Sequence, residues 1–217
     1  MIQLDGIKAV VFDFDGLMIE SESIAYQVWC EVLGTYGKNF TEDIYHNVIG
    51  RGPLESVEYL IEVLDLPLPP QELLETYWLE RTERVCRDGS PAPGLIDLMQ
   101  FLTDRGLVFG VASNSPSRYV IEVLEAMGLA EHFGCVRCRE DVVQGKPAAD
   151  VYLAAAACLE VDHEHCLALE DSPIGLQAAL NAGMRCLVVP NKDLEGEDFS
   201  GAEGRFSSLS EVLAALS

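Results

Sequence analysis

The chain has 217 residues, of which 49% are hydrophobic and 23% charged, as expected for an ordinary folded protein of one or two domains. Its 14 Lys and Arg residues against 36 Asp and Glu residues give a formal net charge of −22. So acidic a surface repels nucleic acid and anionic lipid, which excludes a general DNA- or RNA-binding protein. A small phosphorylated ligand stays possible, because a few local cations can dominate one pocket.

The sequence carries no signal for a membrane or for export. No apolar stretch reaches the ~18 residues needed to span a bilayer, and Asp5 and Lys8 interrupt the N-terminal segment where a signal peptide is apolar. The seven cysteines are an odd number in a chain of ordinary domain size. We therefore expect reduced thiols in a cytoplasmic protein and no membrane partner. Nothing in the sequence demands more than a monomer, which is the expected state.

The first predicted element is a strand, and a helical region follows it. Ala9–Phe12 is apolar at consecutive positions, which is typical of a parallel strand covered on both faces. From about Glu20 to Arg87 apolar residues repeat at helical spacing, and no strand pattern occurs. The breaker-rich stretch Asp88–Gly94 then ends this region. The change predicts a helical insert, residues 18–90, in a core domain of residues 1–17 and 91–217.

The remaining chain alternates strand-like and helical patterns. The expected strands are Leu107–Ala112, Cys135–Cys138, Cys166–Leu169 and Cys186–Val189. The expected helices are Leu95–Leu102, Val120–Met127, Val151–Cys158 and Leu176–Ala182. This alternation predicts an α/β fold, a Rossmann-like doubly wound parallel sheet in a three-layer arrangement with helices on both faces.

The predicted strands are followed by polar residues. Asp13-Phe14-Asp15-Gly16 follows the first strand, Ser113-Asn114-Ser115-Pro116 the second and Glu170-Asp171-Ser172-Pro173 the fourth, while Gly145-Lys146-Pro147 lies after the third. Ligands of open α/β sheets bind outside the carboxyl ends of the strands. We therefore expect four carboxylates, one lysine and several hydroxyl groups to meet at one edge.

These residue types suit magnesium-assisted phosphoryl transfer. Clustered carboxylates repel one another unless a cation neutralises them, and Mg²⁺ prefers carboxylate oxygens, water and phosphate. Lys146 supplies a positive charge for phosphate oxygens. In Asp13-x-Asp15, one carboxylate can attack phosphorus while the other transfers protons. Ser115-Pro116 and Ser172-Pro173 each predict a helix N-cap followed by proline, so two helix N-termini would face the same edge.

Together the motifs resemble those of the haloacid dehalogenase superfamily, in the subgroup of β-phosphoglucomutase and small sugar-phosphate phosphatases. They lie in Val10–Glu22, Val111–Ser115, Gly145–Tyr152 and Leu167–Met184. The resemblance implies that Asp13 is the nucleophile, which forms an aspartyl phosphate. It implies that Asp15 is the general acid and then the base for water. Dehalogenases of the superfamily lack this second Asp, so its presence favours phosphate chemistry.

The same resemblance implies the rest of the site. Ser113 and Lys146 would hold the phosphoryl oxygens, and Asn114 would contribute its backbone. The helical insert would be a mobile cap. The implied ligands of Mg²⁺ are Asp13, the Asp15 carbonyl group and Asp171, with Glu170 beside them.

Two residues of the insert are substrate candidates. Arg51 lies in the cap loop that faces the site in similar proteins, although a solvated surface arginine is equally consistent with the sequence. Ser21 stands in Glu20-Ser21-Glu22, where the family often has Asp-Ser-Glu, and it keeps the hydroxyl group. Ala25 occupies a position at which β-phosphoglucomutases carry a histidine.

Three functions follow from these observations. The first is a Mg²⁺-dependent phosphatase of small phosphorylated metabolites. The second is a phosphomutase, which returns the phosphoryl group to the sugar and is disfavoured by Ala25. The third is a signalling module resembling a receiver domain, which is disfavoured because Asp-x-Asp follows the first strand and a helical insert is present. Zinc on Cys135-x-x-Cys138 is also disfavoured, because a second Cys-x-x-Cys is absent.

Overall fold

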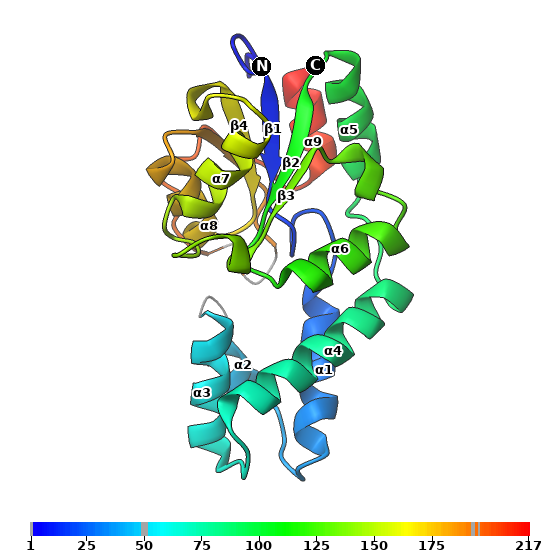
Figure 1. The fold of residues 1–217 in the computed structure, drawn as a ribbon, viewed down its shortest axis with the longest axis vertical. Coiled ribbons are helices and arrows are strands. Elements are labelled where there is room, and N and C mark those ends of the chain that lie inside the picture. The colour runs from blue at the N-terminus through cyan, green and yellow to red at the C-terminus, as the bar shows by residue number, and fades with distance from the viewer. Residues whose placement is uncertain (1, 49–51, 192–193, 195) are drawn as a thin grey trace. The chain divides into compact units, whose positions relative to one another are not determined.

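The structure is a computed structural model that describes residues 2–48, 52–191, 194 and 196–217. The chain separates into two compact units (Figure 1). The first, here called the sheet unit, comprises residues 1–20 and 90–217. The second, the helical unit, comprises residues 21–89, and the part of it that the structure describes contains helices and no strand.

A parallel sheet forms the centre of the sheet unit. Its strands, in the order β3-β2-β1-β4-β5-β6, all run in the same direction among the described residues. The first strand lies in the middle and pairs with β2 and β4, so its carboxyl end is central in the edge. The strands are β1 (Ala9–Phe12), β2 (Val108–Ala112), β3 (Cys135–Arg137), β4 (Cys166–Glu170), β5 (Arg185–Val188) and β6 (Gly204–Arg205).

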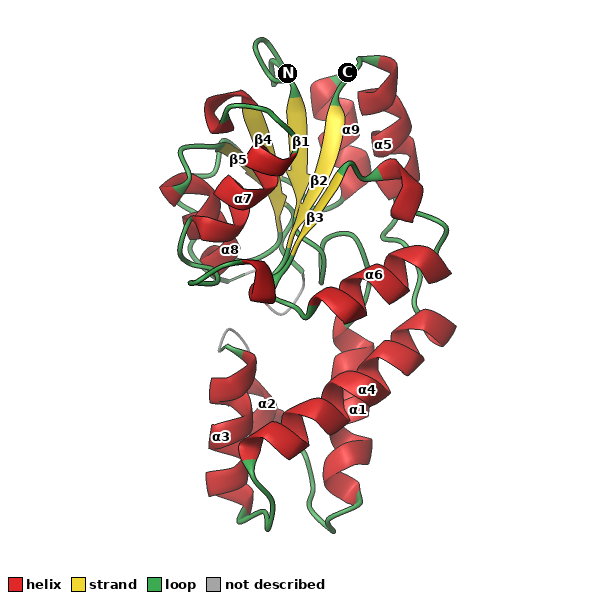
Figure 2. Cartoon of the chain, in the orientation of Figure 1, coloured by secondary structure: helices red, strands yellow, loops and turns green. Residues whose placement is uncertain are grey.

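Helices cover both faces of this sheet, with α7 and α8 on one face and α5 and α9 on the other (Figure 2). Alternate residues of β1 point to opposite faces. Ala9 and Val11 belong to the apolar core built with α7 and α8, whereas Phe12 packs edge-on against Phe109 and Phe133. The helices are α5 (Leu95–Asp104), α6 (Ser117–Ala126), α7 (Asp150–Cys158), α8 (Pro173–Asn181) and α9 (Leu209–Leu216). Short 3₁₀ turns are η1 (Ala130–His132), η2 (Arg139–Asp141) and η3 (His163–His165).

The predicted fold class is confirmed, and the differences are in the details. The Rossmann-like three-layer arrangement is present, and the expected strands occur within one or two residues of their predicted ends. The C-terminal helix α9 and the two-residue strand β6 were not predicted. A two-residue strand is too short for a pattern of period two to be recognised in sequence.

The helical unit contains α1 (Glu22–Gly34), α2 (Glu42–Val48), α3 (Pro53–Leu64) and α4 (Pro70–Asp88). Trp29 of α1 stacks on Tyr77 of α4 with ring centroids 3.9 Å apart, which joins the two longest helices. Arg81 is buried in the same region and donates hydrogen bonds to Tyr77 (3.0 Å) and Ser21 (3.2 Å). That this unit acts as a cap stays a prediction.

The two connections between the units begin at neighbouring points of the sheet unit. Ile19 forms an isolated antiparallel bridge with Pro91, and the Ala92 N–H donates to the Met18 carbonyl group at 2.7 Å. The segment that leaves the sheet unit is therefore hydrogen-bonded to the segment that returns. Within the described ranges, no helix has the length and apolar composition that crossing a membrane requires.

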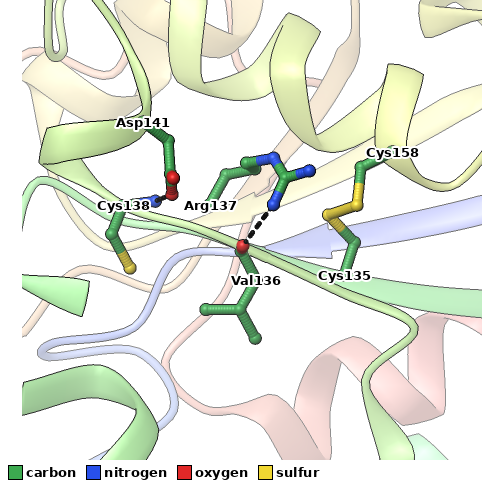
Figure 3. The surroundings of a disulfide bond; sticks show 6 residues. All are labelled: Cys135, Val136, Arg137, Cys138, Asp141 and Cys158. Atoms are coloured by element: carbon green, nitrogen blue, oxygen red, sulfur yellow. Dashed lines mark hydrogen bonds between the residues drawn. A yellow bond between two sulfur atoms is a disulfide. The ribbon is translucent and has the colours of Figure 1, made fainter. Parts of the chain in front are cut away.

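The expectation of seven reduced thiols is wrong for one pair. Cys135 of β3 and Cys158 at the end of α7 form a disulfide, with their Cα atoms 6.0 Å apart (Figure 3). The two cysteines pair because α7 packs against β3. They are 23 positions apart in sequence, so their proximity could not be predicted from the sequence. Disulfides are rare in reducing compartments, so the cysteines no longer support a cytoplasmic location.

Cys138 does not complete a Cys-x-x-Cys metal site. Its neighbour in that pattern, Cys135, is in the disulfide. Burial raises the pKa of the Cys138 thiol to about 12, so the thiol stays protonated, and metals bind the thiolate. The Cys138 backbone N–H instead donates to the Asp141 carboxylate at 2.7 Å (Figure 3). These contacts are those of a structural turn.

Candidate active site

The turn after β1 places Asp13 at the carboxyl edge of the sheet. The Asp13 N–H donates to the Leu169 carbonyl group at 2.9 Å, so the pairing of β1 with β4 continues to this residue. Gly16 closes the turn with φ +80°, a conformation that glycine adopts without a steric penalty. A Cβ atom at Gly16 would also overlap the Asp171 carboxylate. The turn thus brings the end of β1 against the residue that follows β4.

Lys146 is bound between two carboxylates at this edge. Its ammonium group donates to the Asp13 carboxylate and to Glu170 Oε1, the latter at 2.5 Å. The Lys146 side chain is 5% exposed, and that of Glu170 is completely buried. Burial lowers the pKa of Lys146, but the charges of Asp13 and Glu170 outweigh burial and raise it above its usual range. Lys146 is therefore a permanent cation beside the predicted nucleophile.

The Glu170 carboxylate accepts hydrogen bonds from three segments of the chain. Oε1 accepts from Lys146 and from the Tyr152 hydroxyl group at 2.7 Å. Oε2 accepts from the Asp171 N–H at 3.1 Å and the Ser172 hydroxyl group at 3.3 Å. Gly175 makes room for this arrangement, because a Cβ atom there would overlap the Glu170 carboxyl group. Glu170 thus connects the end of β4 to the loop of Lys146, to the first turn of α7 and to the N-cap residue of α8.

Three buried carboxylates lie close enough to share a cation. Among the residues that the structure describes, Asp13, Glu170 and Asp171 offer oxygen atoms that all lie within 4.8 Å of one another. The pKa of Asp13 is raised to about 7 by burial, with repulsion from Glu170 as the next cause, while Lys146 opposes the rise. Three crowded carboxylates fit a hard divalent cation, which would offset the repulsion that raises the pKa of Asp13.

The carboxylate of Asp15 is held by two hydroxyl groups. Ser115 Oγ donates to Asp15 Oδ2 at 2.6 Å, and the Tyr119 hydroxyl donates to Oδ1 at 2.7 Å. The prediction that Ser115 caps the following helix is wrong, since α6 begins at Ser117 and the Ser115 hydroxyl is bonded to Asp15 instead. A hydrogen bond to a carboxylate is about twice as strong as a neutral one, which favours this partner. Ser172 does cap α8, accepting from the Gly175 N–H at 3.1 Å.

Ser113 and Asn114 follow β2 at the same edge. Ser113 is 2% exposed, its N–H donates to the Arg137 carbonyl group, and its hydroxyl oxygen accepts from the Ser115 N–H at 3.0 Å. The Asn114 side chain bonds the backbone of Lys146. The structure therefore brings the end of β2 and the Lys146 loop together, as the position of the motifs predicted.

The two candidate residues of the helical unit are Ser21 and Arg51. Ser21 is buried there against Arg81. Arg51 lies outside the described residues. The roles predicted for both stay predictions.

Two tyrosines that contact the site were not among the predicted site residues. Tyr119 bonds Asp15 and Tyr152 bonds Glu170, each from the first turn of a helix, and both are fully buried. Buried tyrosines at helical spacing have the same pattern as core residues, so periodicity alone does not reveal their hydroxyl contacts. Their position in sequence could have indicated a contact with the site, because each tyrosine follows one of the polar motifs by a few residues.

Comparison with known proteins identifies the family. The family model for haloacid dehalogenase-like hydrolases matches residues 7–183. The chain is 35% identical over 211 residues to a protein of Bacillus subtilis strain 168 named "Putative phosphatase YhcW", covering 97% of this chain and 96% of that protein. It is 29% identical over 214 residues to hexitol phosphatase B of Escherichia coli K12, covering 96% of this chain and 95% of that enzyme.

A solved structure gives the same result for the fold. The structure of CbbY from Rhodobacter sphaeroides in complex with phosphate has a TM-score of 0.88 and 27% identity, covering 97% of this chain and 99% of that one. The family model, the relatives and the fold all agree with the resemblance inferred from the four motifs. The chain belongs to the haloacid dehalogenase-like hydrolases.

Proposed function

We propose that the chain is a Mg²⁺-dependent phosphatase that hydrolyses small phosphorylated metabolites of the sugar-phosphate type through an aspartyl phosphate on Asp13. The observation that carries the proposal is the buried ammonium group of Lys146, bonded to both Asp13 and Glu170. A cation fixed beside a nucleophilic carboxylate is what an incoming phosphate dianion needs, because the dianion and the carboxylate repel each other.

The relatives support the substrate class. The Escherichia coli relative is named for phosphates of hexitols, and the Rhodobacter sphaeroides structure contains phosphate. The net charge of −22 leaves little attraction for a polyanion, so the substrate is a small molecule rather than a nucleic acid.

In the first half-reaction a carboxylate oxygen of Asp13 attacks phosphorus. The bond from phosphorus to the alcohol oxygen breaks, and that oxygen takes a proton from Asp15. The products are the free alcohol and the phosphorylated Asp13. Lys146, Ser113 and the backbone of Asn114 bind the phosphoryl oxygens, as the family resemblance implies.

In the second half-reaction Asp15, now ionised, removes a proton from water. The water oxygen attacks phosphorus, and the bond to Asp13 breaks. Inorganic phosphate leaves, Asp13 regains its carboxylate, and Asp15 is protonated for the next cycle. One residue thus acts first as acid and then as base.

The residues that would hold Mg²⁺ are Asp13, Asp171 and the carbonyl group of Asp15, with Glu170 adjacent. When bound, the ion neutralises charge on the phosphoryl group. The all-oxygen donor set and the repulsion of Asp13 by Glu170 support this assignment. Among the described residues, Glu170 accepts five hydrogen bonds from protein donors, and we assign charge and orientation as its principal contribution.

Ala25 favours a phosphatase over a phosphomutase. The two differ in whether water or a bound hydroxyl group takes the phosphoryl group. Ala25, buried on α1, has no group that could transfer a proton, and mutases of the family carry histidine at the corresponding position. If a hexose 1-phosphate is supplied with Mg²⁺, inorganic phosphate should accumulate. Appearance of the 6-phosphate instead would identify a mutase.

The direct test is a panel of phosphorylated metabolites, including hexose, pentose, polyol and nucleoside monophosphates. Phosphate release is measured with Mg²⁺ and with excess chelator. We expect release from sugar or polyol phosphates with Mg²⁺ only, together with a covalent phosphoenzyme trapped by rapid mixing. Turnover that is unaffected by the chelator would contradict the proposal.

A further inference from the structure

Both carboxylate oxygens of Asp15 accept a hydroxyl hydrogen bond from one short segment. Ser115 ends the polar stretch after β2, and Tyr119 lies in the first turn of α6. Their hydroxyl groups lie 2.6 and 2.7 Å from Oδ2 and Oδ1. Fixing both oxygens fixes the rotation of the carboxyl group as well as its position.

The Tyr119 hydroxyl is itself held in place by the core. Tyr119 is 1% exposed, and its ring packs edge-on against Phe14, with centroids 5.7 Å apart and planes at 86°. Phe14 is the residue between Asp13 and Asp15 and is completely buried. The ring of Tyr119 therefore packs on the same turn whose carboxylate its hydroxyl group binds.

The second donor is held as firmly. Ser115 is buried, and its backbone N–H donates to the Ser113 hydroxyl oxygen at 3.0 Å. Its carbonyl group accepts from the Arg139 N–H at 3.3 Å. The Ser115 hydroxyl group consequently approaches Asp15 from a backbone that is bonded on both sides.

We propose that Tyr119 is a positioning residue that, together with Ser115, orients the carboxyl group of Asp15 for proton transfer. The inference rests on the proposed function, because it needs Asp15 to be the acid and base. Proton transfer depends on alignment, and a carboxyl group that rotates freely is aligned for only part of the time. The Tyr119 hydroxyl removes that freedom without touching the substrate.

A double-mutant cycle tests the proposal. The substrate is the alkyl phosphate with the fastest turnover in the panel. We expect Tyr119→Phe to lower its kcat about 10-fold with little change in KM, since a displacement of ~1 Å costs up to about 100-fold. In an Asp15→Asn background the same substitution should cost less than about 2-fold, because the carboxyl group that it positions is gone.

A purely structural role for Tyr119 predicts a different result, namely the same loss in both backgrounds. That outcome, or unchanged kcat in the single variant, would overturn the proposal. Ser115→Ala provides a second cycle with the same expectation if Tyr119→Phe is poorly folded. Tyr26→Phe is the matched control, because it removes a partly buried tyrosine hydroxyl group that donates to the Phe40 carbonyl group in the helical unit.

A substrate whose leaving group needs no proton tests the proposed function independently of the role of Tyr119. An activated aryl phosphate needs no acid, so 4-nitrophenyl phosphate should phosphorylate Asp13 at the wild-type rate in Tyr119→Phe. Formation of the phosphoenzyme in the wild type shows that the proposed function holds whatever the cycle gives. Failure to form it in the wild type would remove the function, whereas an additive cycle would remove only the role of Tyr119.

Discussion

Asn114 and Lys146, 32 residues apart in the chain, are joined by two hydrogen bonds between the amide of one and the backbone of the other. The Lys146 N–H donates to Asn114 Oδ1 at 2.8 Å, and Asn114 Nδ2 donates to the Lys146 carbonyl group at 3.2 Å. A Cβ atom at Gly145 would lie 2.6 Å from Asn114 Oδ1, so the preceding residue has little space for a side chain. The amide thus fixes the loop that carries the central cation of the site.

Replacing Asn114 by alanine should therefore act through Lys146. We expect kcat/KM to fall about 10-fold for alkyl and aryl phosphates alike, because a cation displaced by a fraction of an ångström loses alignment with the phosphoryl group in both. Steady-state kinetics on the two substrate classes checks this. Asn181→Ala is the control, since Asn181 donates to the neighbouring Pro147 carbonyl group from an exposed position. Equal losses in the two variants would contradict a specific role for Asn114.

Asp171→Ala should abolish Mg²⁺-dependent turnover. It removes one of three clustered carboxylates, and Mg²⁺ leaves its hydration shell only for a sufficient set of charged oxygens. Binding has a separate readout, because an ion that binds only the folded protein raises the melting temperature. We expect saturating Mg²⁺ to stabilise the wild type and not the variant. Asp198→Asn, an exposed carboxylate bonded to Ser200, should retain both responses.

Gly175→Ala should damage the site by a steric route. The added methyl group would occupy the space of the Glu170 carboxyl group, which is bonded to Lys146 and Tyr152. Overpacking of a well-packed interior costs about 1–3 kcal/mol, and here we expect the upper end of that range. Urea unfolding measures the loss. Gly34→Ala is the contrast, because a Cβ atom there meets nothing within 4 Å, so unchanged or higher stability is expected.

The position of the site could be predicted from sequence because it depends on strand ends. A consecutive apolar run such as Ala9–Phe12 predicts a buried parallel strand, and parallel strands place the residues that follow them at one edge. Asp13, Lys146 and Asp171 were therefore predicted to meet without any knowledge of contacts. The parallel sheet then brings the three together.

Hydrogen-bond partners could not be predicted in the same way. Ser115-Pro116 has the pattern of a helix cap, yet the Ser115 hydroxyl group donates to Asp15, because a carboxylate competes successfully with a backbone amide. Tyr119 and Tyr152 lie on helix faces whose periodicity is that of core residues. Cys135 and Cys158 pair because a strand and a helix pack together. Each of these contacts depends on tertiary placement, which a single sequence does not contain.

The disulfide should contribute measurably to stability. Closing a loop between cysteines that are 23 positions apart in sequence is expected to stabilise the folded chain by about 2–4 kcal/mol. A reductant should therefore lower the melting temperature of the wild type by several degrees and have no effect on Cys158→Ser. Cys30→Ser, which changes a free cysteine, should keep the wild-type response. A melting temperature insensitive to reductant would show that the bond makes no contribution.

Asp13 and Asp15 lie two residues apart yet have separate contacts, and we expect their roles to be separable by substitution. Asp13 is bonded to Lys146, whereas Asp15 is bonded to Ser115 and Tyr119. Asp13→Asn removes the nucleophile, so no covalent phosphoenzyme should form with any substrate. Asp15→Asn leaves the nucleophile and removes the proton transfer, so alkyl phosphate turnover should fall roughly 10²–10⁴-fold.

In Asp15→Asn the first half-reaction should proceed with an activated substrate, whereas the second should be slow. An activated aryl or acyl phosphate leaves without a proton, so Asp13 should still be phosphorylated. Hydrolysis of the aspartyl phosphate needs a base, so this intermediate should accumulate. The leaving group should then be released in an initial burst. Intact-protein mass spectrometry after brief mixing should show the added phosphoryl mass in Asp15→Asn and not in Asp13→Asn. The reverse pattern would mean that the two roles are exchanged, and unchanged alkyl phosphate turnover in Asp15→Asn would exclude that residue from proton transfer.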